Sequence, residues 1–386
     1  MSIRIFVGDT YTDGIANAFL KKGVEVVRFK MPARDSGKEL YYQLLDEYEV
    51  RERDFIFTLD FFPELSEACY KRHVKYISWV WDSPHASLWS KKAHYDTNYI
   101  FLFDYFQYIE QQRRGMENVF YLPIGSDAEF FQKVIAEDSG NNKGKYASEI
   151  SFVGNLYSEE QYDLLSKVKY IPPYTKGYID GILAAQRNIW GADLIGTCIS
   201  TEVWNSLKEY IKWDLGERYD EGVYEATMKN VFGQKIAQME RTNLCSELAK
   251  RYDFRLYTKS DTSYDKRIVN CGYADYKSMM PLIFYYSKIN INITSRSIKS
   301  GIPLRVMDVL ASGGFLLTNY QHEIAEYFDD GVDLVIFEDY EDLYEKADYY
   351  LKHEDERKKI AGNGYRKVTD IFPLVKQIDT IINTIN

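Results

Sequence analysis

The stretch SGIPLRVMDVLASGG, residues 300–314, has the composition of an anion-binding helix start. Pro303 suits the first helical position, because its ring fixes φ and it has no N–H group to leave unbonded, and Gly313 suits a helix end. We therefore predict a helix over residues 303–312. The free N–H groups at its start, together with the glycine of the GIP tripeptide, would form a site for an anion.

Two charged side chains of this helix point to a nucleotide diphosphate. Arg305 lies in the first turn, where a cation opposes the helix dipole, so its position favours a phosphate in front of the helix. An i,i+3 pair with Asp308 is the alternative interpretation of Arg305. Asp308 lies too deep for capping, and its carboxylate could accept from ribose hydroxyl groups. The preceding loop adds cations, hydroxyls and unhindered backbone: Arg296, Ser297, Lys299, Ser300, Gly301 and Ile302.

Proton-transfer groups follow an earlier apolar run, YISWVWDSPH. Asp82 stands at the predicted strand end and His85 three residues later. A histidine can accept a proton near neutral pH, and Asp82 could orient it or act itself, so we name Asp82 and His85 as candidate catalytic residues. A turn that Asp82 stabilises through its own backbone is an equally good interpretation. Asp60 ends another run, DFIFTLD, and helix capping is the leading interpretation there.

Other strand ends contribute weaker candidates. Gly154 and Asn155 follow SEISFV and could bring backbone close to a phosphate or sugar, although a plain turn explains them as well. Asn319 and His322 follow FLLT and could contact sugar hydroxyls, against the alternative of helix capping. Second-choice carboxylates, Asp9 and Asp13, follow the first predicted strand, where a capped turn is the stronger interpretation. Arg241 lies in a helical pattern that predicts a solvated face.

Composition limits the function classes. The chain has 386 residues and a formal net charge of −10, which argues against a general nucleic-acid or membrane-surface binder. Its four cysteines are scattered without CxxC spacing, so the sequence predicts neither a zinc site nor a disulfide framework. No Asp-x-Asp motif is present, and we expect no metal and no cofactor. The chain starts in a predicted strand, and no stretch is long enough to span a bilayer, so we expect a cytoplasmic protein.

Short apolar runs alternate with helical patterns along the chain, which predicts parallel, wound α/β sheets. The runs fall into two groups, separated by a polar linker at 138–145. Those of the first group are 4–9, 24–29, 54–60, 74–82, 98–104 and 119–125. Those of the second group are 148–155, 254–260, 287–295, 315–320 and 334–339.

The two groups predict two Rossmann-like domains. The first spans residues 1–135, and a final helix over 374–386 could cross back to it. The second spans 146–373. Within it, residues 156–252 show helical spacing instead of strands, so we predict a helical insert that could shape an acceptor site or a homodimer contact.

The chain resembles a family of enzymes through several of these stretches. SGIPLRVMDVLASGGFLLTNYQHEIAEYF, SEISFVGNLY and YLKHEDERKKIAGNGYRKV resemble the nucleotide-sugar-binding half of CgeB-like glycosyltransferases, relatives of the group 1 transferases. YISWVWDSPH, NYIFLFD and YLPIGSD fit the other half. The resemblance implies a GT-B fold, in which two Rossmann-like domains face a central cleft and the donor binds mainly to the C-terminal domain.

What the resemblance implies about function is sugar transfer from a nucleotide-diphosphate donor to a glycan, protein or small-molecule acceptor, without a metal ion. One departure bears on mechanism. Group 1 transferases carry two glutamates around this loop, and Asp308 can stand for the second, but Ser300 or Ile298 stands where the first is expected. Inversion and retention therefore both stay open. The alternative function is a noncatalytic nucleotide-sugar or glycan-binding protein, and a sugar-phosphate epimerase or phosphorylase is a third.

Overall fold

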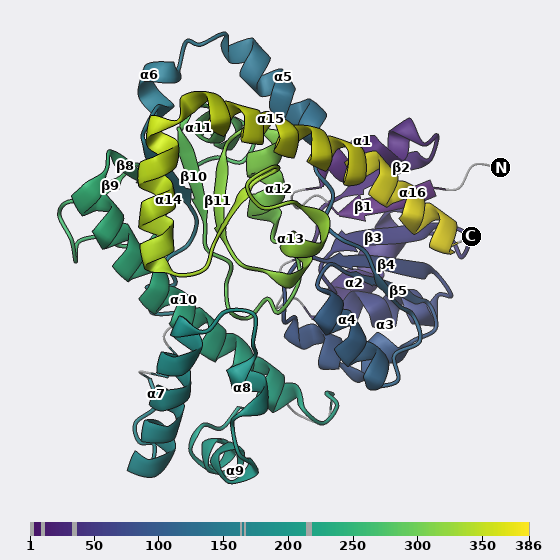
Figure 1. The fold of residues 1–386 in the computed structure, drawn as a ribbon. Coiled ribbons are helices and arrows are strands. Elements are labelled where there is room, and N and C mark those ends of the chain that lie inside the picture. Colours follow the sequence, from purple (N-terminus) through teal and green to yellow (C-terminus); the bar gives the residue numbers. More distant parts are fainter. Residues whose placement is uncertain are drawn as a thin grey trace. The chain divides into compact units, whose positions relative to one another are not determined.

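The computed structural model of the protein divides the chain into two compact units. It describes residues 4–8, 12–32, 37–162, 164–165, 167–213 and 218–385. Unit 1 comprises Met1–Gly125, Trp213–Thr227 and Phe372–Asn386, and unit 2 comprises Ser126–Lys212 and Met228–Ile371. Figure 1 shows the strands of each unit as one sheet flanked by helices. Each unit is a wound α/β structure, as the alternating pattern predicts.

Unit 1 is built on a parallel six-stranded sheet of order β2-β1-β3-β4-β5-β6. Its strands are β1 Arg4–Gly8, β2 Glu25–Phe29, β3 Phe55–Leu59, β4 Lys75–Val80, β5 Asn98–Leu102 and β6 Val119–Tyr121. Its helices are α1 Asp13–Lys21, α2 Lys38–Glu47, α3 Pro63–Lys71, η1 Ala86–Trp89, η2 Lys91–His94, α4 Tyr105–Arg113 and α16 Leu374–Ile385.

Two apolar layers cover the two faces of this sheet. Side chains alternate between faces along a strand, and β4 divides its residues accordingly: Tyr76 and Val80 join one buried cluster, while Ile77 and Trp79 join the other. Helices α2 and α3 contribute to the first cluster, and α1 and α16 to the second. The near-continuous apolar strands follow from this burial on both faces.

Unit 2 is built on a second parallel sheet, of order β12-β11-β10-β7-β8-β9. Its strands are β7 Ile150–Val153, β8 Phe254–Tyr257, β9 Val269–Asn270, β10 Ile289–Asn292, β11 Leu316–Asn319 and β12 Val335–Phe337. Helices follow or precede the strands: α5 Ala128–Asp138, α6 Lys143–Tyr146, α11 Met280–Tyr286, α12 Leu304–Ala311, α13 His322–Tyr327, α14 Tyr340–Lys352 and α15 Glu354–Ile371.

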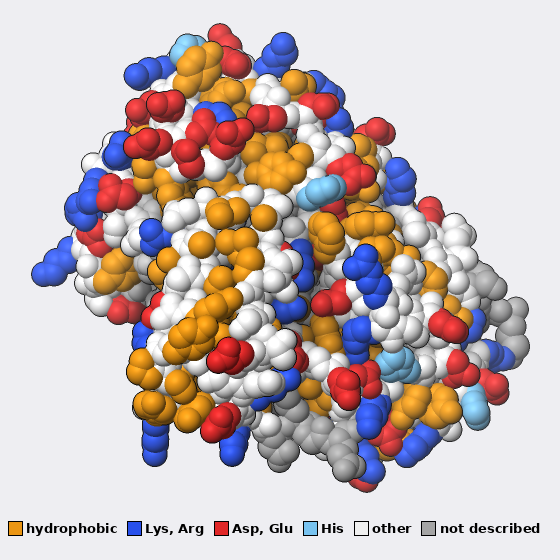
Figure 2. Space-filling model, turned by 60° about the horizontal axis from the view of Figure 1, so that its bottom comes forward, with side chains coloured by type: hydrophobic (Ala, Val, Ile, Leu, Met, Phe, Trp, Pro, Cys, Tyr) orange, Lys and Arg blue, Asp and Glu red, His pale blue; other side chains and the backbone are white. Residues whose placement is uncertain are grey.

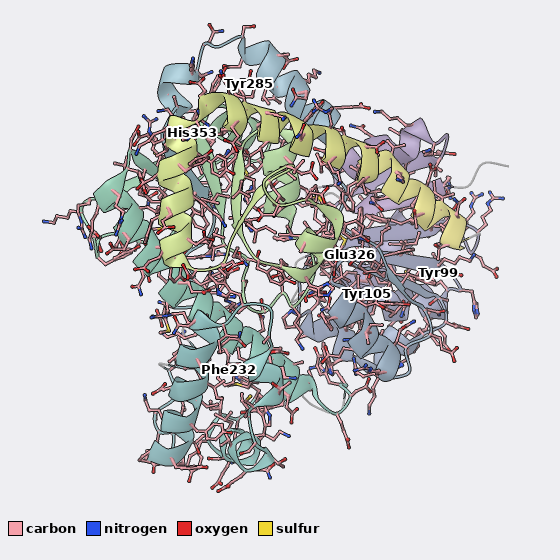
Figure 3. The ribbon with its side chains drawn as sticks, in the orientation of Figure 1. Tyr99, Tyr105, Phe232, Tyr285, Glu326 and His353 are labelled. Atoms are coloured by element: carbon pink, nitrogen blue, oxygen red, sulfur yellow. The ribbon has the colours of Figure 1, made fainter. Side chains whose placement is uncertain are left out.

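Between β7 and β8 the chain is helical, in the region where the sequence predicts an insert. The helices are α7 Pro173–Asn188, α8 Leu194–Thr197, α9 Thr201–Tyr210 and α10 Val223–Arg251. Phe232 of α10, labelled in Figure 3, is fully buried, and its ring lies 6.3 Å from the ring of Trp204 of α9. Helices α9 and α10 of the insert therefore pack against each other through apolar side chains.

The boundary between the units differs from the predicted one. Residues 126–135 belong to unit 2 and not to the first domain, because α5 packs there. The ring of Phe131 lies 5.5 Å from that of Tyr276, and Gln132 Nε2 donates to the carbonyl of Ala311 at 2.9 Å.

A short segment of the predicted insert belongs to unit 1 instead of unit 2. Within residues 213–227, the N–H of Asp220 donates to the carbonyl of Trp89 at 2.8 Å. The carboxylate of Asp220 accepts from Arg114 Nη2 at 2.8 Å. These contacts come from residues more than a hundred positions apart, which local sequence patterns do not reveal.

None of the described helices combines the length and the apolar character that crossing a bilayer requires. On the face drawn in Figure 2, basic and acidic side chains of the described residues are interspersed.

Candidate functional site

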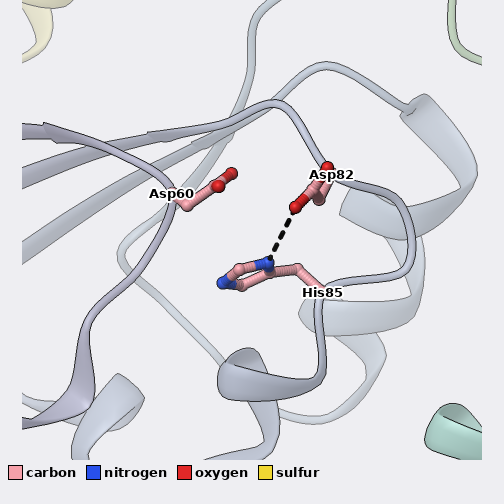
Figure 4. Close-up of side chains that lie close together, drawn as sticks. All are labelled: Asp60, Asp82 and His85. Carbon is pink, nitrogen blue, oxygen red and sulfur yellow. Dashed lines mark ion pairs between the residues drawn. The ribbon is translucent and has the colours of Figure 1, made fainter. Parts of the chain in front are cut away.

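In unit 1, three side chains with chemistry to offer converge beyond the carboxyl ends of β3 and β4 (Figure 4). Asp60 follows β3, Asp82 lies two residues after β4, and His85 lies three residues further on. The two strands are parallel neighbours, with Leu59 opposite Trp79, so their ends meet at one edge of the sheet. The structure thus brings both predicted catalytic residues together with Asp60.

The imidazole of His85 is oriented by the backbone. Its exposed fraction is 5%, and its Nε2 lies 3.3 Å from the carbonyl oxygen of Phe61. A carbonyl can only accept, so we assign the ring proton to Nε2. Nδ1 then faces Asp82, whose Oδ2 lies 3.9 Å away and whose side chain is 64% exposed. In this pair, Asp82 reaches solvent and His85 is held behind it.

Asp60 occupies an uncommon backbone conformation, with φ of 62° in the left-handed region. Thr58 Oγ1 donates to the carbonyl of Asp60 at 2.8 Å and lies 2.7 Å from the hydroxyl of Tyr76. The N–H of Trp81 donates to Asp60 Oδ1 at 3.2 Å. Left-handed backbone in a residue other than glycine persists only where neighbours hold it, and such residues gather at functional sites.

The loop after Asp82 is tied to the next strand. Ser83 Oγ donates to Asp104 Oδ2 at 2.7 Å, and both residues are buried. Asp104 also caps α4 by accepting from the N–H of Phe106. Of the second-choice carboxylates, Asp13 pairs with Arg28 at 3.0 Å and Asp9 lies outside the described residues.

In unit 2, the remaining predicted residues lie at the carboxyl ends of three adjacent strands, β11, β10 and β7. Asn319 is buried, and its Oδ1 accepts from the N–H of Thr294 at 2.7 Å. Gln321 Nε2 donates to the carbonyl of Ile298 at 3.0 Å. The end of β11 therefore braces the loop that follows β10, and Asn319 acts there as a scaffold.

Ser300 is hydrogen-bonded to a carboxylate that the sequence did not predict as its partner. Its hydroxyl donates to Glu323 Oε1 at 2.7 Å, and its carbonyl accepts from the N–H of Glu323 at 3.1 Å. Both side chains are about 1% exposed. An acid from α13 thus contacts Ser300, one of the two positions where the resemblance to group 1 transferases predicts a glutamate. His322, the first residue of α13, is exposed.

The two cations of this loop pair with acids from the helical insert. Lys299 Nζ lies 2.9 Å from Asp193 Oδ2. Arg296 Nε lies 3.1 and 3.2 Å from the two carboxylate oxygens of Glu240, and its guanidinium carbon lies 4.7 Å from the ring centroid of Trp190. Glu240 is fully buried, and this burial raises the pKa of its carboxyl, against the lowering effect of Arg296.

The helix with the predicted anion site is α12, which Pro303 precedes as its N-cap. Gly301 and Ile302 before it are buried. The predicted helix therefore forms, one residue shorter at each end. Its start lies at the same edge of the sheet as the other donor-binding candidates, because it follows β10.

Arg305 and Asp308 are engaged with each other. Arg305 Nη1 lies 3.0 Å from Asp308 Oδ2 and contacts the sulfur of Met280. The hydroxyl of Tyr276 donates to Asp308 Oδ1 at 3.0 Å. Asp308 is 3% exposed, and burial raises its pKa to about 6, although Arg305 and Tyr276 oppose the rise. The alternative interpretation of Arg305, an i,i+3 pair, describes this geometry, while the phosphate and ribose roles stay predictions.

Arg241 is buried, which contradicts the solvated face that its helical pattern predicts. It is 9% exposed, and its guanidinium donates to the carbonyls of Asn155 and Ile293, the latter at 2.6 Å. Because these carbonyls follow β7 and β10, Arg241 ties the two strand ends together. A side chain on Gly154 would come within 3.2 Å of the ring of Phe152. Gly154 and Asn155 therefore lie at the predicted edge, with Arg241 beside them.

Comparison with known proteins adds a family match for part of the chain. Residues 240–383 match the protein-family model described as Glycosyl transferase-like. The matched range contains the loop after β10, helix α12 and the start of α13. No curated protein sequence matches the chain.

Solved structures of similar fold span nearly the whole chain. HepE from Anabaena in complex with UDP-glucose has a TM-score of 0.51 at 8% identity, covering 99% of both chains. The UDP-forming α,α-trehalose-phosphate synthase from Burkholderia xenovorans has a TM-score of 0.54 at 11% identity, covering 99% of this chain and 98% of that one. The sucrose-phosphate synthase from Thermosynechococcus elongatus has a TM-score of 0.50 at 10% identity, covering 99% of both.

At these identities the comparison establishes the fold. Two parallel six-stranded sheets with flanking helices, matched over the length of these enzymes, define the GT-B fold. The predicted fold class is confirmed. The CgeB-like subtype stays a prediction.

Proposed function

We propose that the protein is a glycosyltransferase that moves a sugar from a nucleotide-diphosphate donor to a carbohydrate, protein or small-molecule acceptor. The observation that carries this proposal is the overlap of two independent features. The residues that match the glycosyl transferase-like model are those that build the β10 and β11 edge of unit 2, where the sequence places the donor. In wound α/β sheets, ligands bind at this carboxyl edge.

A UDP-sugar is the first donor class to examine. HepE was solved with UDP-glucose, and the Burkholderia synthase is UDP-forming. In this chain the proposed diphosphate groups are Lys299, Arg296 and the start of α12, and a ligand phosphate would compete with Asp193 for Lys299. Donor binding of this kind uses protein cations in place of a metal ion, so we propose that the diphosphate is held without one.

On the acceptor side, we assign proton transfer to Asp82 and His85. The exposed carboxylate of Asp82 is the group that an acceptor hydroxyl can reach, and the buried imidazole of His85 lies 3.9 Å behind it. This assignment rests on the geometry within unit 1 alone. The outcome at the anomeric carbon, inversion or retention, does not follow from it.

We further propose a reducing, cytoplasmic setting. What supports this proposal is the pair of exposed thiols, Cys198 and Cys271, which a reducing compartment keeps reduced. A homodimer through the helical insert stays a prediction.

The proposal is tested by thermal unfolding with UDP-glucose and with GDP-, CDP- and dTDP-sugars, followed by hydrolysis assays on each ligand that binds. A ligand at 100 times its dissociation constant stabilises the folded state by about 2.7 kcal/mol. Stabilisation by one nucleotide sugar, together with slow hydrolysis, supports a transferase. Stabilisation without any turnover supports the noncatalytic alternative, and no stabilisation by any of them refutes both.

Two lysines on either side of β10 make a matched pair of variants. Lys299 follows the strand, and Lys288 directly precedes it at the opposite end. Lys299→Ala should weaken binding of UDP on the order of tenfold and leave uridine binding nearly unchanged, because only the diphosphate meets the ammonium group. Lys288→Ala should alter neither. Equal losses for UDP in both variants would contradict the location of the donor.

A further inference from the structure

We infer that Asp60, Asp82 and His85 form a binding site for one divalent transition-metal ion. This inference goes beyond the proposed transferase activity and does not depend on it; in the metal-bound protein Asp82 and His85 are ligands, and the proton-transfer role proposed above belongs to the metal-free form. Taken one from each residue, the candidate ligand atoms all lie within 4.8 Å of one another. They belong to three segments that the sheet brings to one edge, and Figure 4 shows them converging on a common point.

The distances suit a single ion. Two atoms bound to one metal at about 2.1 Å in tetrahedral geometry lie about 3.4 Å apart. The Nδ1 of His85 and Oδ2 of Asp82, at 3.9 Å, come within about 0.5 Å of this separation. The widest pair, within 4.8 Å, needs to close by at most about 1.4 Å, which rotation of the carboxylate side chains can supply.

The orientation of the buried His85 ring provides the second, independent observation. The contact of Nε2 with the carbonyl of Phe61 turns Nδ1 of the buried ring toward the carboxylate of Asp82. This side chain is 95% buried, and the 3.9 Å separation from Asp82 is too long for a hydrogen bond. Metal-binding histidines are held in this way, with the other ring nitrogen donating to a backbone carbonyl or carboxylate.

Charge and ligand type identify the ion. Two carboxylates and a neutral imidazole carry a charge of about −2, which a divalent cation neutralises. One nitrogen and two oxygens suit Zn²⁺ or Mn²⁺ better than Mg²⁺ or Ca²⁺, which prefer oxygen ligands throughout. The carboxylate of Asp60 is already held in position for metal binding, because it accepts from the N–H of Trp81 and extends from a left-handed backbone. Three protein ligands leave at least one coordination position open to an oxygen ligand from solvent.

The test is metal binding by the purified full-length protein, free of any histidine tag and stripped with a chelator. Mn²⁺ is followed by loss of its free-ion electron paramagnetic resonance signal and Zn²⁺ by calorimetry, both without nucleotide sugar. One ion per chain is expected. Asp82→Asn should weaken binding tenfold or more, and because the side chain is exposed the fold is kept. Asp96→Asn, at an exposed acid near β5, should bind like the unmodified protein.

A second variant isolates the nitrogen ligand. His85→Gln should weaken Mn²⁺ and Zn²⁺ as strongly as Asp82→Asn, with its fold checked by circular dichroism. The inference is overturned if neither ion binds in a saturable way, or if the ions bind and Asp82→Asn binds them as tightly as Asp96→Asn. Since no sugar donor is present, these results are independent of the donor-binding test.

Discussion

Asp308 offers a measurement that separates a structural acid from a ribose-binding one. The change to make is Asp308→Asn, which keeps the shape of the side chain and an oxygen that can accept from Tyr276. What it removes is a buried negative charge. If Asp308 is mainly a structural acid, the removal must change the pH dependence of stability in a calculable way.

The magnitude follows from the pKa of the carboxyl, which burial raises from an ordinary 3.8 to about 6 after the opposing effect of Arg305. A folded-state pKa above the unfolded one means that the folded protein holds a proton between these pH values that the unfolded chain has released. The resulting stability is fully present below about pH 4 and is lost as the pH rises through 6. At about 1.4 kcal/mol per unit, the ionised carboxyl destabilises the folded state by roughly 3 kcal/mol at pH 7.5.

Asp308→Asn should therefore be more stable than the unmodified protein at pH 7.5, and this gain should shrink to about 1 kcal/mol at pH 4.5 and toward zero below about pH 4. For a unit of roughly 200 residues, the gain corresponds to a rise in unfolding temperature of about 6 to 12 °C. Scanning calorimetry at five pH values measures it. Asp370→Asn, at an exposed position of α15, is the control for losing one carboxylate. A stability difference that is the same at every pH would refute the argument from burial.

Two further predictions concern unit 2. Glu240→Gln should destabilise the protein by about 3–5 kcal/mol at neutral pH, because the side chain of Arg296, at 9% exposure against 22% for Arg305, would be left buried without its acid. Chemical denaturation measures the loss, and a loss below about 1 kcal/mol would show that the guanidinium of Arg296 reaches solvent in the variant. Gly364→Ala should destabilise by about 1–3 kcal/mol or more, since its new methyl group would lie 2.2 Å from the carbonyl oxygen of Asp333. Gly362→Ala lies in the same helix, and its new methyl group would be 3.9 Å from the nearest atom, so this variant should be neutral or stabilising in the same assay. Similar losses of stability in both variants would contradict the packing argument.

The strands were predictable because burial on both faces makes each of them a continuous apolar run. All five runs of the second sheet predicted from the sequence coincide with strands. The exception is β9, Val269–Asn270, whose two exposed residues carry no such pattern. The division into units was less predictable, since it depends on pairings such as Asp220 with Arg114, which join distant segments.

The candidate site was predictable only as far as topology fixes it. Strand ends of a parallel sheet meet at one edge, so Asp60, Asp82 and His85 could be named from the sequence, whereas the direction of each side chain could not. Arg241 was missed because a charge in a helical pattern is usually solvated. The sequence signal that could have predicted this burial is the neighbouring Glu240. It falls on the apolar stripe between Ala237 and Leu244, and it is fully buried there.

The left-handed backbone at Asp60 limits what evolution or engineering can do with this position. Only glycine, asparagine and aspartate adopt that conformation readily. Glycine would relieve the backbone, but it would also delete the carboxylate, so a screen for thermostability and a screen for cation binding should select opposite residues here. A chain under selection for both properties keeps the aspartate, and such a conflict between stability and function is typical of functional sites.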